Sequence, residues 1–258
     1  MGFFEQSIIM EAKRVVITGL GAITPIGNNV PDYWDSLCKG VGGAGMITRF
    51  DASKFKSRIA CEVKNFDPLQ YFDRKEARKL DLFEQFAMIS ADEAINDSGI
   101  NRDNTDFTEV GVIFASGIGG IESLSLETID FARGDGTPRV SPFTIPKLLP
   151  DLAAGNISIK YGFQGPNYCT VSACASSANA IINAFRYIHY GRNEVMIARV
   201  KSGGSATTRR FGPIPSNTSR RMPRISPAVR TSVLEPLAKY SIGVYRLTRA
   251  LPCQMLQT

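Results

Sequence analysis

GPNYCTVSACASSANAI, residues 165–181, is typical of a buried strand that runs through a turn of small residues into a helix. Apolar positions continue at helical spacing as far as Gly191, a residue type that commonly ends helices. EVMIA, residues 194–198, then has the composition of a short strand. The order strand, helix, strand predicts two parallel strands of one sheet joined by a right-handed helical crossover.

Two further apolar runs resemble this strand, because each leads into a glycine-rich turn. RVVITGLGAIT, residues 14–24, and EVGVIFASGIGG, residues 109–120, are rich in β-branched residues and lack the polar alternation of a half-exposed strand. The stretch up to about Lys64 reads as loop with one edge strand. Together these segments predict an α/β fold with a mainly parallel mixed sheet covered by helices on both faces.

The helices have start and stop signals. Residues 74–98 carry apolar residues at helical spacing and predict one continuous helix that ends at Gly99. Asp32 is the expected N-cap of a short helix near the start of the chain. Further helices are expected at residues 121–131 and immediately before Gly162.

The composition indicates a cytoplasmic protein with a core. The chain has 258 residues, of which 43% are hydrophobic, but no apolar run approaches the roughly 18 residues that would span a membrane. Its first residues lack the features of a secretion signal. Five cysteines at irregular spacing argue against a disulfide framework, and a single histidine without a CxxC pair argues against a metal site.

Charge divides the chain into two unlike parts. Residues 1–200 hold 20 Lys and Arg against 23 Asp and Glu, a net charge of −3. Residues 201–258 hold ten Lys and Arg against one Glu, a net charge of +9, among many Ser and Pro. Such a composition buries little apolar surface, so this part is expected to contribute little core.

Cys174 is the residue most suited to covalent chemistry. A cysteine between a strand and the first turn of a helix lies near unpaired N–H groups and the positive end of the helix dipole, which favours the nucleophilic thiolate. The small residues around it leave room for an acyl chain, and a turn N–H can donate to a developing oxyanion. From these seven residues alone, a small buried hydrophobic side chain explains Cys174 equally well.

Several motifs in order resolve that ambiguity. VVITGLGAITPIGN, RKEARKLD, ASGIGG, SPFTIP and GPNYCTVSACASSANAI together resemble the elongating β-ketoacyl-acyl carrier protein synthases of fatty-acid synthesis, from about Lys13 to Ala198. The resemblance implies a thiolase-like fold, of which complete members stack two similar halves as layers α-β-α-β-α. This chain supplies the N-terminal half.

The resemblance also implies a reaction and its partners. Cys174 would accept an acyl group from acyl carrier protein, and malonyl-carrier protein would then condense with it, with loss of carbon dioxide and without cofactor or metal. Ile118, in the GIGG turn, matches the position that gates the depth of the acyl pocket, and Phe143, in SPFTIP, would border the acyl channel. Cys169 is expected to be structural. Relatives look dimeric, so a second copy or a separate C-terminal half is a further expected partner.

The resemblance stops abruptly near residue 199. Ala206 stands where the family has Glu after GGS, and an Arg-, Ser- and Pro-rich stretch follows. We therefore expect a leader at residues 1–12, a β-ketoacyl synthase domain at 13–198, and a basic tail at 199–258 that is an out-of-frame or foreign continuation. The alternative is a genuine basic arm for RNA, DNA or anionic lipid, but the tail lacks a nucleic-acid-binding motif and no nucleic-acid partner is expected.

Three functions remain open at this stage. The family's decarboxylating histidines, lysine and glycine-rich phenylalanine loop are absent from the sequence, and the only histidine, His189, is expected to be structural. The chain is therefore a condensing enzyme completed by another polypeptide, a non-catalytic or partner-dependent half-domain, or another cysteine-dependent acyltransferase or thioesterase.

Overall fold

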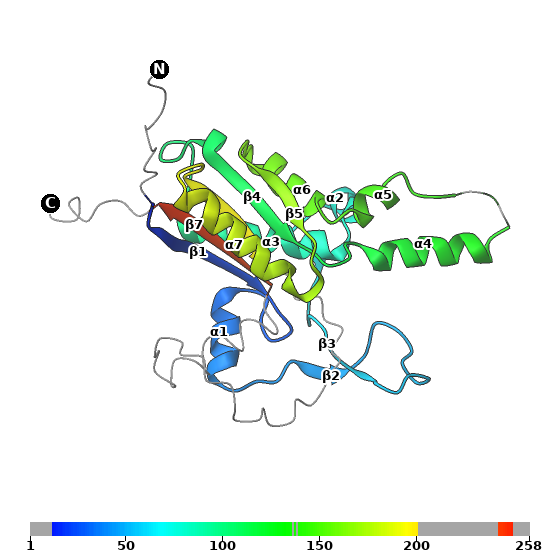
Figure 1. Cartoon of the computed structure of the whole chain (residues 1–258). Helices are drawn as coiled ribbons and strands as arrows, with labels where there is room; N and C mark the ends of the chain where they lie inside the picture. The colour runs from blue at the N-terminus through cyan, green and yellow to red at the C-terminus, as the bar shows by residue number, and fades with distance from the viewer. Residues whose placement is uncertain (1–11, 136, 138, 201–241, 250–258) are drawn as a thin grey trace, which may run out of the picture.

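The computed structural model describes residues 12–135, 137, 139–200 and 242–249. Its main sheet has five strands in the order β1-β7-β6-β4-β5 (Figure 1). β4 is parallel to β5 and β6, whereas β7 is antiparallel to both of its neighbours, so four strands point one way and β7 the other. The expected α/β fold with a mainly parallel mixed sheet is confirmed. The strands are β1 Val15–Ile23, β4 Val110–Ala115, β5 Asn167–Thr170, β6 Val195–Val200 and β7 Ile242–Arg249.

Helices cover both faces of this sheet (Figure 1). α7 packs on one face, and α3 and α6 pack on the other. Outside the sheet, β2 and β3 pair as a short antiparallel ribbon, where one edge strand was expected. The bounds are α1 Val30–Cys38, β2 Ala44–Met46, β3 Ile59–Cys61, α2 Arg74–Lys79, α3 Leu82–Ser98, α4 Ile121–Arg133, α5 Thr144–Leu148, α6 Leu152–Tyr161 and α7 Ser176–His189.

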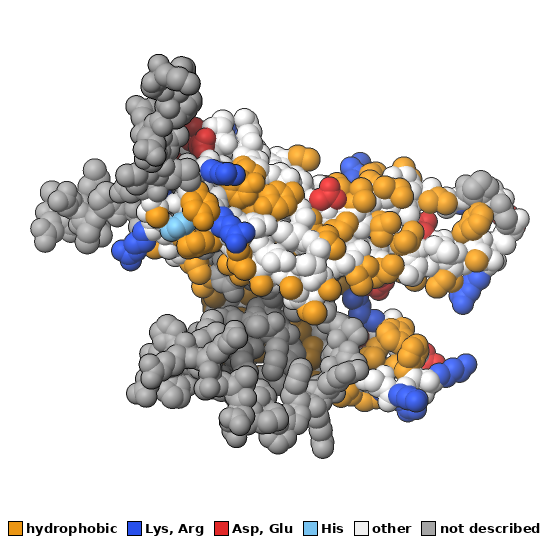
Figure 2. Space-filling view, viewed as in Figure 1, with side chains coloured by type: hydrophobic (Ala, Val, Ile, Leu, Met, Phe, Trp, Pro, Cys, Tyr) orange, Lys and Arg blue, Asp and Glu red, His pale blue; other side chains and the backbone are white. Residues whose placement is uncertain are grey.

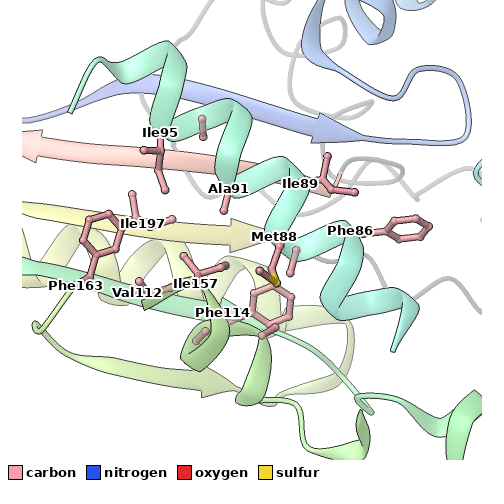
Figure 3. Packing of buried hydrophobic residues seen from close by; sticks show 14 of the residues in the cluster. Phe86, Met88, Ile89, Ala91, Ile95, Val112, Phe114, Ile157, Phe163 and Ile197 are labelled. Carbon is pink, nitrogen blue, oxygen red and sulfur yellow. The ribbon is translucent and has the colours of Figure 1, made fainter. Parts of the chain in front are cut away.

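The two buried central strands divide their side chains between two cores. On β4, Val112 and Phe114 join the core under α3 and α6, whereas Ile113 and Ala115 face α7. β6 alternates in the same way, as expected where successive side chains point to opposite faces. Figure 3 shows the larger core, in which Ile157 of α6 lies beside these strand residues. Because both faces of these strands are buried, their sequences are continuous apolar runs and do not alternate between apolar and polar residues.

Glycines in β1 allow α3 to approach its backbone closely. A Cβ atom on Gly21 would overlap the carbonyl oxygen of Ser90, and one on Gly19 would overlap that of Ala94. The expectation that β1 is buried holds only for the end of the strand, from Gly21 onward, because Ile17 and Leu20 are exposed.

The helix expected at residues 74–98 is two helices. Leu80 adopts an extended backbone (φ −103°, ψ 135°), which ends α2 before α3 begins. Asp81 caps α3 in a capping box with Glu84, in which each side chain accepts an N–H from the other end of the turn. The single-helix prediction was wrong because the apolar spacing continues across this break. Gly99 ends α3 in the left-handed conformation, as predicted (φ 66°).

Two other helix ends can be compared with the sequence. Asn29, rather than Asp32, caps α1: the Asn29 side chain accepts the Asp32 N–H at 2.8 Å. The predicted end of α6 at Gly162 is confirmed, with φ 76°.

Part of the expected basic tail belongs to the sheet, because the backbone of Ile242–Arg249 forms β7 between β1 and β6. The expected leader, apart from residue 12, and residues 201–241 and 250–258 lie outside the described residues, so the domain boundaries stay predictions. Within the described ranges, no helix is long and apolar enough to cross a membrane.

Candidate functional site

Cys174 lies in a short 3-10 turn, Ala173–Ala175, between the carboxyl end of β5 and the amino end of α7. Its side chain is exposed and its thiol is free. Ala175, the N-cap residue of α7, makes no side-chain capping hydrogen bond. Because alanine has no polar side-chain atom, Ala175 does not satisfy the first N–H groups of α7. The thiol of Cys174 is therefore next to the positive end of the helix dipole.

Ser176 holds this turn together from inside. Its hydroxyl donates to the Ala173 carbonyl at 2.7 Å and accepts the Ser172 N–H at 2.8 Å. Its own carbonyl accepts the hydroxyl of Thr170, from the end of β5, at 2.8 Å. Ser176 is fully buried, so the turn that carries Cys174 is tied to both the strand and the helix.

The residue before the cysteine has an unusual backbone conformation. Ala173 has φ 50°, in the left-handed region that non-glycine residues rarely enter. The hydrogen bonds of Ser176 hold it there, so the strain is offset by the surrounding structure. The sharp bend carries the chain from β5 into α7 and leaves Cys174 on the outside.

Ile118 is in the turn that follows β4, next to the cysteine turn. A Cβ atom on Gly117 would lie 3.9 Å from the Cα atom of Ala173, so the two turns are neighbours. The side chain of Ile118 is 65% exposed. Gly119 has φ 75° and its N–H donates to the hydroxyl of Ser116 at 3.0 Å, which shapes the turn.

Phe143 lies outside both of these turns. It immediately precedes α5, is 37% exposed, and has the ammonium of Lys79 5.7 Å from its ring centroid. α5 reaches the Ile118 turn through Leu148, whose carbonyl accepts the Gly120 N–H at 3.2 Å. Among the described residues, no hydrogen bond joins Phe143 to Cys174. Its assignment to the acyl channel stays a prediction.

A buried carboxylate pair, which the sequence interpretation missed, supports the Ile118 turn. Asp81 accepts the hydroxyl of Ser123 at 2.6 Å and lies against Gly120, where a Cβ atom would be 2.8 Å from its Oδ2 atom. Glu84 accepts the Asp81 N–H at 2.8 Å, and its Oε1 atom has no hydrogen-bond partner. Burial raises the pKa of Glu84 to about 7, despite the hydrogen bond from Asp81. The DxxE spacing of a capping box was the available signal.

Cys169 and His189, the other residues weighed for a role in the chemistry, lie away from the cysteine turn. Cys169, on β5, is partly buried, and burial raises the pKa of its thiol. His189 ends α7, where its Nδ1–H donates to the Lys13 carbonyl at 2.9 Å and its ring stacks on Phe185 with centroids 4.9 Å apart. In the part of the chain that the structure describes, no cluster of three His, Cys, Asp or Glu residues could hold a metal.

Curated relatives match most of this chain but less than half of their own length. A 3-oxoacyl-[acyl-carrier-protein] synthase 2 from Synechocystis sp. is 47% identical over 189 residues, which are 73% of this chain and 45% of the relative. Proteins of the same name from Staphylococcus aureus and Coxiella burnetii are 43% and 45% identical over 44% and 45% of their lengths. The chain thus spans about half the length of these relatives.

Solved structures show the same fold. The ishigamide ketosynthase/chain length factor superposes with a TM-score of 0.71 at 22% identity, covering 92% of this chain and 59% of that one. A β-ketoacyl synthase from Burkholderia phymatum superposes with a TM-score of 0.65 at 22% identity and similar coverage. The ketosynthase-like fold confirms the thiolase-like expectation.

The family described as "Beta-ketoacyl synthase, N-terminal domain" matches residues 12–210. The chain therefore belongs to the β-ketoacyl synthase family.

Proposed function

We propose that this chain is the N-terminal part of a 3-oxoacyl-acyl carrier protein synthase of fatty-acid elongation, with Cys174 as the acyl-accepting nucleophile. The observation that carries the proposal is the exposed thiol of Cys174 on a strained turn at the amino end of α7. The relatives named 3-oxoacyl-[acyl-carrier-protein] synthase 2 support it, because a match over 189 of the 258 residues of this chain must include this turn.

The first half-reaction needs only groups that lie near this turn. The thiolate of Cys174 attacks the thioester carbonyl of an acyl-carrier protein, and the carrier thiolate leaves as the acyl-cysteine forms. Backbone N–H groups at the amino end of α7 are the donors that would stabilise the negative oxygen. Ile118, on the neighbouring turn, would limit the length of acyl chain that fits.

The second half-reaction needs groups from another polypeptide segment. Malonyl-carrier protein loses carbon dioxide, and its carbanion displaces the Cys174 thiolate to give a 3-oxoacyl-carrier protein two carbons longer. His189 cannot serve this step from the opposite end of α7, about 20 Å away by the rise of a 14-residue helix. A C-terminal half or a second copy is the proposed source of the decarboxylating groups. Without it, the chain is inactive in condensation.

The proposal also includes an acyl-carrier protein as the partner and the cytoplasm as the location. One structural neighbour is a type II polyketide ketosynthase in complex with its acyl-carrier protein, which supports, for this chain, a carrier protein as the acyl donor. The four described cysteines are free thiols, in agreement with a reducing compartment such as the cytoplasm.

Acyl transfer without condensation is the second candidate function. It is favoured by the same observation, because loading of Cys174 requires the turn and the α7 N–H groups but no decarboxylating histidine. A thioesterase would release free acid repeatedly, an acyltransferase would pass the acyl group to another thiol, and a synthase half would retain it on Cys174.

Mass spectrometry of the loaded chain tests these functions. The purified chain is incubated with octanoyl-carrier protein, and the peptide that contains Cys174 is examined for the acyl mass. We expect stoichiometric acylation that Cys174→Ser abolishes and the matched Cys169→Ser variant retains. Malonyl-carrier protein should yield 3-oxoacyl product only when a C-terminal half is supplied. Equal labelling of all cysteines, or continuous release of octanoate, would overturn the synthase proposal.

A further inference from the structure

A cavity of about 260 Å³ lies at the end of α7 opposite Cys174. One lining residue comes from β5, three come from the second half of α7, and two follow the helix. The lining residues are Tyr168, Asn183, Arg186, Tyr187, Tyr190 and Arg192. Asn183, the lining residue nearest to the start of α7, is about 10 Å along the helix from Ser176, so this cavity is separate from the cysteine turn.

The two arginines of the cavity have no acidic partner. In the described part of the chain, neither Arg186 nor Arg192 forms an ion pair with a carboxylate. No Asp or Glu is among the lining residues. Figure 2 shows basic side chains at the end of the molecule where α7 ends. The cavity therefore has two positive charges that a bound anion would balance.

The remaining polar groups are suited to an anion as well. The rings of Tyr168 and Tyr187 are tilted against each other with centroids 6.4 Å apart. Burial raises the pKa of Tyr168 to about 12, and the neighbouring Tyr187 contributes in the same direction. Tyr168 therefore stays a neutral hydroxyl at physiological pH, able to donate to an anion and not repelling it. Asn183 also lines the cavity, and its side-chain amide adds a further hydrogen-bond donor.

We propose that this cavity binds a small phosphate monoester. Two guanidinium groups and phenolic hydroxyls match the several acceptor oxygens of a phosphate dianion, and the tyrosine rings offer apolar surface to its organic part. The volume is just below the roughly 300–1,000 Å³ of sites for drug-sized ligands, which limits the organic part to a small group.

Calorimetric titration of the full 258-residue chain tests the proposal, with phenyl phosphate, inorganic phosphate and benzoate as probes at constant ionic strength. Phenyl phosphate is expected to bind at least tenfold more tightly than either of the others. Its affinity should fall about fourfold from pH 7.5 to pH 5.5, because the second pKa of a phosphate monoester is about 6. Equal binding of inorganic phosphate, or of benzoate, overturns the ester proposal.

Paired variants locate the binding. Arg186→Gln and Arg192→Gln should each weaken phenyl phosphate binding at least tenfold, whereas Arg133→Gln, at the exposed end of α4, should leave it unchanged. Circular dichroism checks that each variant folds, and Arg192, which follows the helix, keeps the test valid if Arg186→Gln does not fold. Similar losses of affinity for all three variants would indicate nonspecific charge binding. No loss for the two cavity variants would place the binding elsewhere, and either result would contradict the proposal.

Discussion

Ala173 has a strained backbone and immediately precedes the proposed nucleophile, Cys174. Its φ of 50° costs a non-glycine residue about 1–2 kcal/mol, and glycine would avoid most of this cost. We expect Ala173→Gly to raise the free energy of unfolding by about 0.5–1 kcal/mol in denaturant titrations. The same change should slow acylation of Cys174, because the turn loses its fixed bend.

Ala175→Gly is the matched control for that prediction. Ala175 has φ −89° in the right-handed region, where glycine only adds flexibility to the unfolded chain. Because Ala175 is the N-cap of α7, where glycine is accepted at least as well as alanine, this variant should change the free energy of unfolding by no more than about 0.5 kcal/mol. If Ala173→Gly stabilised the chain no more than Ala175→Gly does, the left-handed backbone of Ala173 would not be a source of strain.

Glu84 should make the stability of the protein depend on pH. Its folded pKa of about 7 lies above the ordinary value of 4.5, so the folded state binds the proton more tightly than the unfolded state does. This contribution is complete below about pH 4.5 and is lost as pH rises through about 7, with a loss of up to about 3 kcal/mol. Denaturant titrations should therefore show Glu84→Gln to be more stable than the parent at pH 8 but not at pH 5.

An exposed glutamate on α2 provides the comparison for Glu84. Glu76→Gln should follow the parent at every pH, since its side chain is in water. A parent chain whose stability stays level between pH 5 and pH 8, after correction with the Glu76 variant, would show that Glu84 is not protonated in the folded state.

Individual residues of the site were predictable to different degrees. Cys174 could be placed because a strand, small residues and a helix in sequence define where a side chain will lie. The left-handed Ala173 could not, because alanine gives no local signal for positive φ. Ser176 was missed for a similar reason: its role depends on the carbonyl of Ala173 and the N–H of Ser172 meeting in space.

At the scale of elements, the packing of α3 on β1 should depend on the glycines of the strand. A Cβ atom on Gly21 would overlap the backbone of Ser90, which a side-chain rotation cannot relieve. We expect Gly21→Ala to lower the free energy of unfolding by about 3 kcal/mol, measured by thermal or urea denaturation. Gly45→Ala, in β2, meets nothing within 4 Å and should change stability little. Equal losses for both variants would contradict the close approach of α3.

The elements themselves were more predictable than their ends. Strands β1, β4 and β6 were found because each is a short apolar run that contains β-branched residues. The break between α2 and α3 was missed because Leu80 continues the apolar spacing while its backbone is extended. Periodicity reports which side of an element is buried, and capping geometry decides where the element ends.

At the scale of the whole molecule, the order in which the strands pair could not be predicted from the sequence pattern. β7 lies between β1 and β6, although its residues follow a stretch of basic and proline-rich composition. Strand order depends on contacts between segments far apart in the chain, which local periodicity does not encode. The same limit applies to the cavity at the end of α7, which brings β5 and α7 together.

The largest unexplained feature of the whole molecule is its exposed apolar surface. Figure 2 shows hydrophobic side chains spread over the region of α4 and α5. Soluble monomers rarely expose apolar patches of more than a few hundred Å². The proposed partner half offers a surface to cover them. The exposed large apolar residues on these helices are Ile121, Leu126, Ile129, Phe131 and Ile145; Leu149 follows α5, and Ile182 and Phe185 are on α7.

We therefore expect the chain alone to self-associate at micromolar concentration and to bind a fluorescent apolar dye. Adding the separately produced C-terminal half of the Synechocystis relative should reduce both light scattering and dye fluorescence. Replacing Leu126 and Phe131 with Gln should reduce self-association of the isolated chain, because both side chains are exposed on α4. Thr128→Gln, at another exposed position on α4, removes no large apolar side chain, so it is the control and should change neither signal. A monomeric chain without dye binding would mean that α4 and α5 need no covering partner.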